Sequence, residues 1–394
     1  MSSIEPNTPK RFGKNLLLFL VPVAALFAVI IVFLRTGGAG LRVEPAAPIE
    51  SLVFEKTTLQ RDRIEVHVRN TSPQELRIAQ VSVRDAFTQF SVHPGPVIPR
   101  LGRAVIGIPY PWVEAEAYGI RLFTGNSVAF DTGIETATET KSADAGTLWS
   151  FTLIGIYVGV IPVFLGIFWF PLLRRLGKRV FLWLMALTVG LLLYLGLDAT
   201  NEALEAAAGI GGPFQGVGLI GIGITATVLG LYAVARRRPG RGEASGQARI
   251  AFMIALGIGL HNLGEGLAIG AAFSVGAASL GTFLVIGFIL QNITEGLGII
   301  APIVKERPSL GTLAGLGILG GAPAIAGTWA GGLVYSPILA VLFLSIGAGA
   351  VFEVAWEIAR LIRQDSRAGE MPLTIAGGVV SGMALLYVTG LLIK

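Results

Sequence analysis

Hydrophobic and polar residues divide the chain into three regions of different pattern. Residues 15–34 form an uncharged apolar run, long enough to cross a hydrocarbon core of about 30 Å as a helix. Residues 42–146 mix β-branched and polar residues in near alternation, which is typical of strands. From Trp149 onward, long apolar segments alternate with short polar connections. This succession predicts an anchor, a β domain and a bundle of membrane-spanning helices.

The first apolar run follows Lys10, Arg11 and Lys14. A cleaved signal peptide is the alternative interpretation, but its apolar core would have only about 7–15 residues. We therefore expect an uncleaved transmembrane anchor over residues 15–35, preceded by a cytoplasmic N-terminus at residues 1–14.

The middle region predicts a small antiparallel β-sandwich over residues 42–146. Its clearest strand patterns are Arg63–Val68, Leu76–Val83 and Tyr118–Phe123, and turn formers separate them. Asn70-Thr71-Ser72 is a glycosylation sequon. His67 and His93 could bind metal, although surface or core histidines explain them more simply.

Eight further apolar segments follow, near residues 149–171, 179–198, 214–235, 250–272, 280–303, 310–333, 337–359 and 372–393. Basic residues lie in alternate connections: Arg174, Arg175, Lys178 and Arg179; Arg236, Arg237, Arg238, Arg241 and Arg249; Lys305 and Arg307; Arg360, Arg363 and Arg367. The intervening loops at 199–213, 273–279 and 334–336 carry no Lys or Arg. The positive-inside rule then predicts a multi-pass protein of the cell membrane, with the β domain and Lys394 outside the cytoplasm.

Composition supports an integral membrane protein. Charged residues make up 14% of the chain, against about 25% in ordinary soluble domains. The 53 glycines suit closely packed membrane helices. The absence of cysteine excludes disulfides, thiolate metal sites and cysteine nucleophiles. A net charge of +5, with basic residues at helix ends, does not indicate nucleic-acid binding, and nothing in the sequence indicates an enzyme or an ATP-driven pump.

Two apolar segments carry related polar motifs, HNLGEG at 261–266 and QNITEG at 291–296. Residues four apart share a helix face, so His261 and Glu265 are expected to present an imidazole and a carboxylate together. The next segment carries a similar set of polar side chains, at Gln291, Asn292 and Glu295. Gly266 and Gly270 form a GxxxG pair, expected to let the two polar-faced helices approach closely.

Ionisable groups at mid-bilayer cost about 2.5–3.5 kcal/mol each, and two facing glutamates repel unless a proton or cation lies between them. Nitrogen and oxygen ligands without sulfur suit zinc, iron(II), manganese or cobalt. Hydrogen bonds between helices are the plainer alternative for buried polar residues.

The paired motifs resemble those of the ZIP family of divalent metal transporters, H-N-x-P-E-G and [H/Q]-[N/D]-x-P-E-G. The resemblance covers about residues 148–394 and implies an eight-helix transport bundle, a homodimer, and import of zinc, iron(II) or a similar ion. It implies no resident cofactor, because the metal is the transported substrate. Membrane lipid is the other expected partner, and the β domain could bind an extracytoplasmic protein.

The resemblance also implies the metal ligands. These are His261, Asn262, Glu265, Asn292 and Glu295, with Gln291 beside them, and Glu295 would bridge two metal positions. Asp198 and Glu202 match an entrance motif, although they could be a solvated helix end. Glu357 matches the family's seventh-span glutamate or could pair with Arg360; Glu353, one turn earlier, is an addition of this chain.

The sequence also departs from the family pattern. Gly264 and Thr294 replace the two motif prolines, and the sixth span offers Pro323 where the family carries a glutamate. We therefore expect one metal site and altered selectivity or rate.

The preferred interpretation is an importer in which the first, fourth, fifth and sixth helices of the bundle move against the others. Metal would enter near Asp198 and Glu202 and leave past Glu353 and Glu357. The alternative is a membrane-anchored metal sensor, or an accessory protein, whose ZIP-like core binds metal without transporting it.

Overall fold

A computed structural model describes residues 10–36, 49–134, 136–140, 144–237, 243–274, 278–334, 336–364 and 371–391. The chain divides into two compact units, Met1–Ile49 and Glu50–Lys394. Several positions that entered the sequence predictions lie outside the described residues: residues 1–9 and 42–48, Arg238, Arg241, Arg367 and Lys394.

The predicted anchor falls on helix α1, Lys10–Arg35. Every side chain from Leu20 to Phe33 is exposed, although nearly all of them are apolar. An exposed apolar helix of this kind suits contact with lipid.

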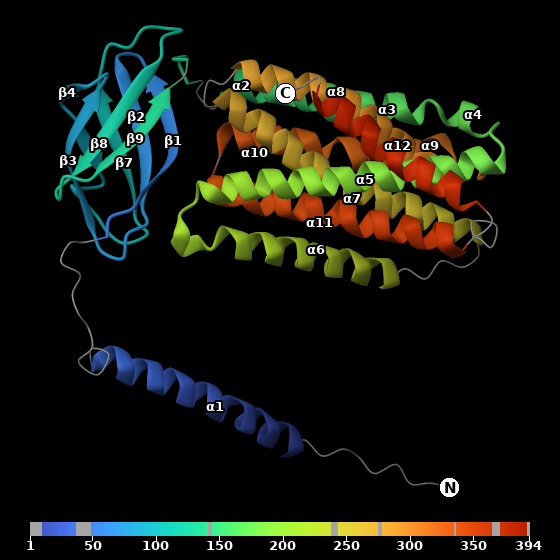
Figure 1. Cartoon of the computed structure of the whole chain (residues 1–394), viewed down its shortest axis with the longest axis horizontal. Coiled ribbons are helices and arrows are strands. Elements are labelled where there is room, and N and C mark those ends of the chain that lie inside the picture. Colours follow the sequence, from blue (N-terminus) through green and yellow to red (C-terminus); the bar gives the residue numbers. More distant parts are fainter. Residues whose placement is uncertain are drawn as a thin grey trace. The chain divides into compact units, whose positions relative to one another are not determined.

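Two antiparallel sheets follow (Figure 1). The first contains, in spatial order, β1 (Leu52–Gln60), β2 (Arg63–Asn70), β7 (Arg103–Pro109) and β5 (Ser91–His93). The second contains β4 (Ala86–Thr88), β3 (Leu76–Val83), β8 (Tyr118–Thr124) and β9 (Ala129–Ile134), with β6 (Val97–Ile98) paired to β3. Alternate residues of β2, such as Ile64, Val66 and Val68, are fully buried in one apolar core with residues of both sheets. The three strand patterns recognised in the sequence are confirmed.

Asn70, at the end of β2, is completely buried. Its Nδ2 donates to the carbonyls of Gln74 and Ile98, both at 2.8 Å, and its Oδ1 accepts from the amide of Ser72 at 2.9 Å. Because every polar atom of this side chain is used inside the domain, the folded sandwich hides the sequon from glycosylation.

The remaining chain is mostly helical (Figure 1). The first membrane segment consists of α2 (Ala145–Gly155), a π-helical turn (Ile156–Val160), α3 (Ile161–Ile167) and α4 (Phe170–Leu173). The others are α5 (Lys178–Ala208), α6 (Gly216–Arg237), α7 (Glu243–Ser274), α8 (Ala278–Ile300), α9 (Leu310–Gly321), α10 (Pro323–Leu333), α11 (Pro337–Gln364) and α12 (Pro372–Leu391). Short 3-10 turns at Gly212–Phe214 and Ala301–Ile303 precede α6 and follow α8.

Within the described residues, seven helical segments are long and apolar enough to cross a membrane, and two more apolar stretches are shorter, Leu20–Phe33 and Pro372–Val388. Each of the eight segments expected after Trp149 falls on one of these helices. The structure therefore indicates a multi-pass membrane protein.

Two of the spans are interrupted, and proline explains one interruption in each. A π-helical turn precedes Pro162 in the first span, and the sixth span is divided between α9 and α10 immediately before Pro323. Proline lacks the N–H that an α-helix needs, and its ring clashes with the carbonyl four residues earlier. The apolar pattern had predicted a single uninterrupted segment for each of these spans.

Glycine-mediated packing differs from the expectation. A Cβ at Gly266 would lie 2.2 Å from the carbonyl oxygen of Ala324, and one at Gly270 would lie 2.3 Å from that of Thr328. The GxxxG pair of α7 therefore packs against α10, and its predicted role between α7 and α8 is wrong. Gly296 of α8 likewise packs against α3, where its Cβ would lie 2.2 Å from the carbonyl of Val163.

Candidate metal centre

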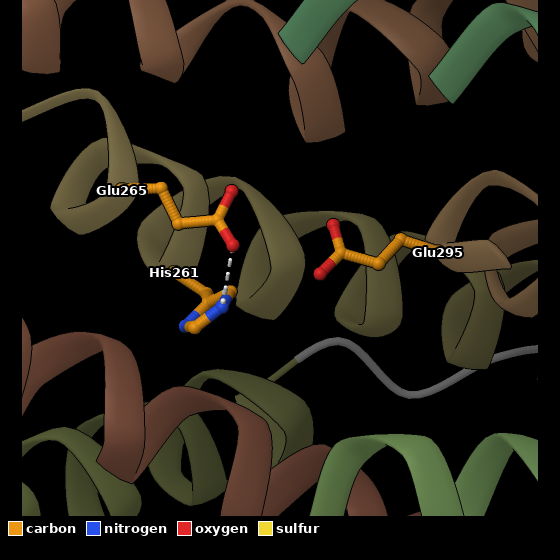
Figure 2. Close-up of side chains that lie close together, drawn as sticks. All are labelled: His261, Glu265 and Glu295. Atoms are coloured by element: carbon orange, nitrogen blue, oxygen red, sulfur yellow. Dashed lines mark ion pairs between the residues drawn. The ribbon is translucent and has the colours of Figure 1, made fainter. Parts of the chain in front are cut away.

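His261 and Glu265 of α7 and Glu295 of α8 point toward one another inside the bundle (Figure 2). One ligand atom from each of the three lies within 4.8 Å of the others. Their exposed fractions are 6%, 4% and 3%, so all three are removed from solvent. Across the described parts of the chain, no other group of three His, Cys, Asp or Glu side chains meets this condition.

The local sequence explains the geometry. His261 and Glu265 are one helical turn apart, and Nε2 of His261 lies 3.2 Å from Oε1 of Glu265. Nε2 of Gln291 donates to the same oxygen at 2.5 Å, and Nδ2 of Asn292 donates to Oε2 at 3.2 Å. Two amides from α8 therefore hold the carboxylate of α7, and the polar faces of the two helices meet as expected.

Several buried acceptor oxygens at this site have no hydrogen bond of ordinary geometry. Both carboxylate oxygens of Glu295 and the Oδ1 atoms of Asn262 and Asn292 are buried without a hydrogen-bond partner among the described residues. A buried polar atom left unpaired costs about 1–3 kcal/mol. Carboxylate and amide oxygens can only accept, so a cation is a partner that such oxygens can take and another acceptor is not.

The amide nitrogens of the same asparagines point to backbone carbonyls of other spans. Nδ2 of Asn262 donates to the carbonyl of Gly320 at 3.0 Å, and Nδ2 of Asn292 donates to that of Val158 at 2.9 Å. Each motif therefore fastens its own helix to an interrupted span. Neither carbonyl could be recognised as a partner from the residue pattern. Pro162 and Pro323, prolines inside apolar segments, were the signals that could have located them.

Asp198 and Glu202 lie outside the three-residue group. Helix α5 continues to Ala208, so both residues sit within the helix and are partly buried. Neither residue therefore ends the helix, and both are only partly exposed. Glu202 interacts electrostatically with His261 and Glu265, which places its charge within range of the site.

Glu353 and Glu357 lie further along α11. A Cβ at Gly347 would contact the Cα of His261 at 3.2 Å, so α11 passes directly beside the site. Glu353 is 4% exposed, and its Oε2 has no hydrogen-bond partner among the described residues. Glu357 lies 3.9 Å from Arg360 and 3.9 Å from Arg249 of α7, so the expected pairing with Arg360 is present and a second arginine joins it.

The structure thus sorts the ten predicted residues into three places. The central group contains His261, Asn262, Glu265, Gln291, Asn292 and Glu295; Asp198 and Glu202 lie on α5; Glu353 and Glu357 lie on α11. Neither a model of any known protein family nor any curated protein matches the chain. Its function therefore has to be inferred from the geometry of the site and from the two motifs.

Proposed function

We propose that this protein is a membrane carrier for a divalent metal cation, which binds between α7 and α8 at His261, Glu265 and Glu295. The observation that carries the proposal is the buried group of three ligand atoms within 4.8 Å of one another. A histidine and two carboxylates together at membrane depth have a high energetic cost, so their presence there indicates a function.

One distance in the group suits a metal of zinc's size. Ligand atoms at about 2.0–2.1 Å from a tetrahedral zinc lie roughly 3.3 Å apart. Nε2 of His261 and Oε1 of Glu265 are 3.2 Å apart, so these two atoms already have the separation of a ligand pair. A set of nitrogen and oxygen ligands equally suits iron(II), manganese and cobalt, and it disfavours copper(I).

Acidic side chains on two other helices extend the site into a path. Glu202 on α5 is electrostatically coupled to the central group, and Glu353 on α11 offers an unpartnered carboxylate oxygen next along that helix. Arg249 and Arg360 then flank Glu357. With the positive-inside rule, these arginines mark the cytoplasmic end, and the path runs inward from Glu202 to Glu357.

The resemblance of the two motifs to those of ZIP transporters supports the same direction and the same class of substrate. It also supports a homodimer and a movement of the first, fourth, fifth and sixth bundle helices against the rest. The hydrogen bonds from Asn292 to the first span and from Asn262 to the sixth are consistent with these four helices behaving as one group.

Uptake by the full chain in proteoliposomes tests the proposal with zinc, iron(II), manganese and cadmium as separate probes. We expect wild-type uptake of at least one metal, and loss of that uptake in Glu295→Ala. Glu205→Ala is the matched control, because Glu205 is an exposed glutamate of α5. Normal uptake by Glu295→Ala would refute the site. Metal bound in detergent without any flux would instead indicate the sensor or accessory protein.

A further inference from the structure

We propose that Pro162 and Pro323 are positioning residues of the metal site, which fix the orientation of the Asn292 and Asn262 amides from the neighbouring spans. The inference rests on the proposed function, because it assumes that a metal binds at the centre of the bundle.

The first interruption leaves one carbonyl without its ordinary partner. In an α-helix, the carbonyl of residue i accepts from the N–H of residue i+4, which for Val158 is the nitrogen of Pro162. Proline has no N–H, and the chain forms a π-helical turn at Ile156–Val160. Nδ2 of Asn292 donates to this carbonyl at 2.9 Å, so a side chain of α8 occupies the position that proline leaves open.

The second interruption lies beside the other motif helix, but there the carbonyl that the asparagine binds is one residue past the carbonyl whose donor proline removes. Pro323 removes the donor that Leu319 would use, α9 ends at Gly321, and α10 begins at Pro323. Nδ2 of Asn262 donates to the carbonyl of Gly320 within this break at 3.0 Å. The backbone of α7 approaches so closely that a Cβ at Gly259 would lie 2.3 Å from the Leu319 oxygen.

These carbonyls help to fix which way each amide turns, and Oε2 of Glu265 is a second acceptor for Nδ2 of Asn292. A carbonyl oxygen only accepts, so each asparagine must turn its NH2 group toward it. The Oδ1 atoms of Asn262 and Asn292 are then left buried, without a partner among the described residues. The reverse orientation would press two acceptors together, and it would turn the NH2 group of Asn292 away from Oε2 of Glu265, to which it donates at 3.2 Å. The carbonyl of Val158 therefore helps to hold the Asn292 amide where it orients the carboxylate of Glu265, a candidate ligand.

The motif helices themselves are regular. Helix α7 continues through Gly264 and α8 through Thr294, so the irregular backbone lies on the spans packed against them. Pro162 and Pro323 touch no metal in this scheme. They act through the asparagines alone.

Cobalt(II) binding to the full chain in detergent tests the inference, by titration and by the visible absorption of the bound ion. Pro162→Ala restores an N–H that can bond to the carbonyl of Val158, which takes from the Asn292 amide one of its two acceptors and leaves only Oε2 of Glu265. We expect cobalt(II) to bind about tenfold more weakly, the lower end of the 10–100-fold effect typical of residues that orient ligands. The absorption spectrum should change as it does in Asn292→Ala. Pro171→Ala is the matched control, since Pro171 lies on the same span in α4 and is exposed.

A double-mutant cycle separates positioning from general stability. If Pro162 acts through Asn292, adding Pro162→Ala to Asn292→Ala should cause no further loss of cobalt(II) affinity. An equal loss in both backgrounds, a wild-type spectrum in Pro162→Ala, or the same loss in Pro171→Ala would overturn the inference. If Pro162→Ala does not fold, the cycle of Pro323→Ala with Asn262→Ala is measured in its place. A wild-type protein that binds no cobalt(II), zinc or manganese refutes the proposed function itself, whereas binding with additive effects refutes only the role of the prolines.

Discussion

Nε2 of His261 lies 3.2 Å from Oε1 of Glu265, one turn along the same helix, whereas the third ligand candidate, Glu295, comes from α8. Two of the three ligand atoms are therefore brought together within α7, and the amides of Gln291 and Asn292 on α8 also hold the Glu265 carboxylate. The third depends on how α7 and α8 pack. A small shift between these helices would open the site without unfolding either of them.

Replacing His261 should remove the nitrogen ligand while leaving the carboxylates in place. We expect His261→Ala to weaken zinc binding by more than about 100-fold, beyond the 10–100-fold range typical of residues that only orient a ligand. Competition with a zinc-chelating dye in detergent measures the effect. His93→Ala is the control, because His93 is exposed on β5 in the sandwich. Wild-type affinity in His261→Ala would exclude the imidazole as a ligand.

Glu357 should affect transport more than binding. Its carboxylate lies 3.9 Å from Arg249 and from Arg360, both at the limit of an ion pair, and the Arg360 side chain is 48% exposed. We expect Glu357→Gln to lower the maximal rate of zinc uptake several-fold, while zinc affinity in detergent stays unchanged.

Arg360→Gln tests whether this ion pair is structural. Exposed pairs contribute at most about 1 kcal/mol, so the free energy of unfolding should change by less than that. Thermal unfolding in detergent measures the change. A larger loss of stability would mean that Glu357 belongs to the scaffold of α11 and not to the path.

The contact between α7 and α10 should tolerate no side chain at Gly331. A Cβ there would lie 2.0 Å from the carbonyl oxygen of Leu267, whereas one at Gly221 of α6 would meet no atom within 4 Å. We expect Gly331→Ala to lower the free energy of unfolding by about 1–3 kcal/mol, the usual cost of overpacking. Gly221→Ala should be neutral or stabilising, because alanine is the better helix former. Equal melting temperatures for the two variants would contradict the close packing.

The sequence was informative where a property depends on neighbouring residues. The length of an apolar run predicts a spanning helix, so the segments after Trp149 fall on helices of the structure. A spacing of four predicted that His261 and Glu265 face the same point, and the polar pattern of the next span added Glu295.

Contacts between spans could not be predicted in the same way. Nothing in the local sequence shows that Gly266 packs against Ala324, or that Arg249 of α7 lies close to Glu357 of α11. The carbonyl of Val158 belongs to an apolar residue, and only the structure shows that Asn292 binds it. Such relationships depend on the tertiary arrangement of α7 and its neighbours.

The sandwich should lose stability in acid because of His67. This residue lies on β2, opposite Lys56 of β1 and Val105 of β7. Burial lowers the pKa of His67 below its ordinary value of 6.5. The positive charges of Lys56 and Arg103 also lower this pKa, whereas the negative charges of Glu65 and Glu55 raise it. The folded domain therefore keeps the imidazole neutral at a pH where the unfolded chain binds a proton, so stability falls as the pH drops through 6.5 toward the lower folded pKa.

Hydrogen exchange of residues 63–70 in the full chain, measured from about pH 7.5 to about pH 5, tests this relation across the ordinary titration range of histidine. His67→Gln cannot bind the proton, so the variant should keep its protection in acid while wild-type β2 loses it. Comparing the two proteins at each pH cancels the intrinsic pH dependence of exchange. His93→Gln serves as the control and should follow the wild type, because His93 is exposed on a different strand of the same sheet. Identical protection of wild type and His67→Gln at every pH would show that this histidine does not couple the stability of β2 to proton binding.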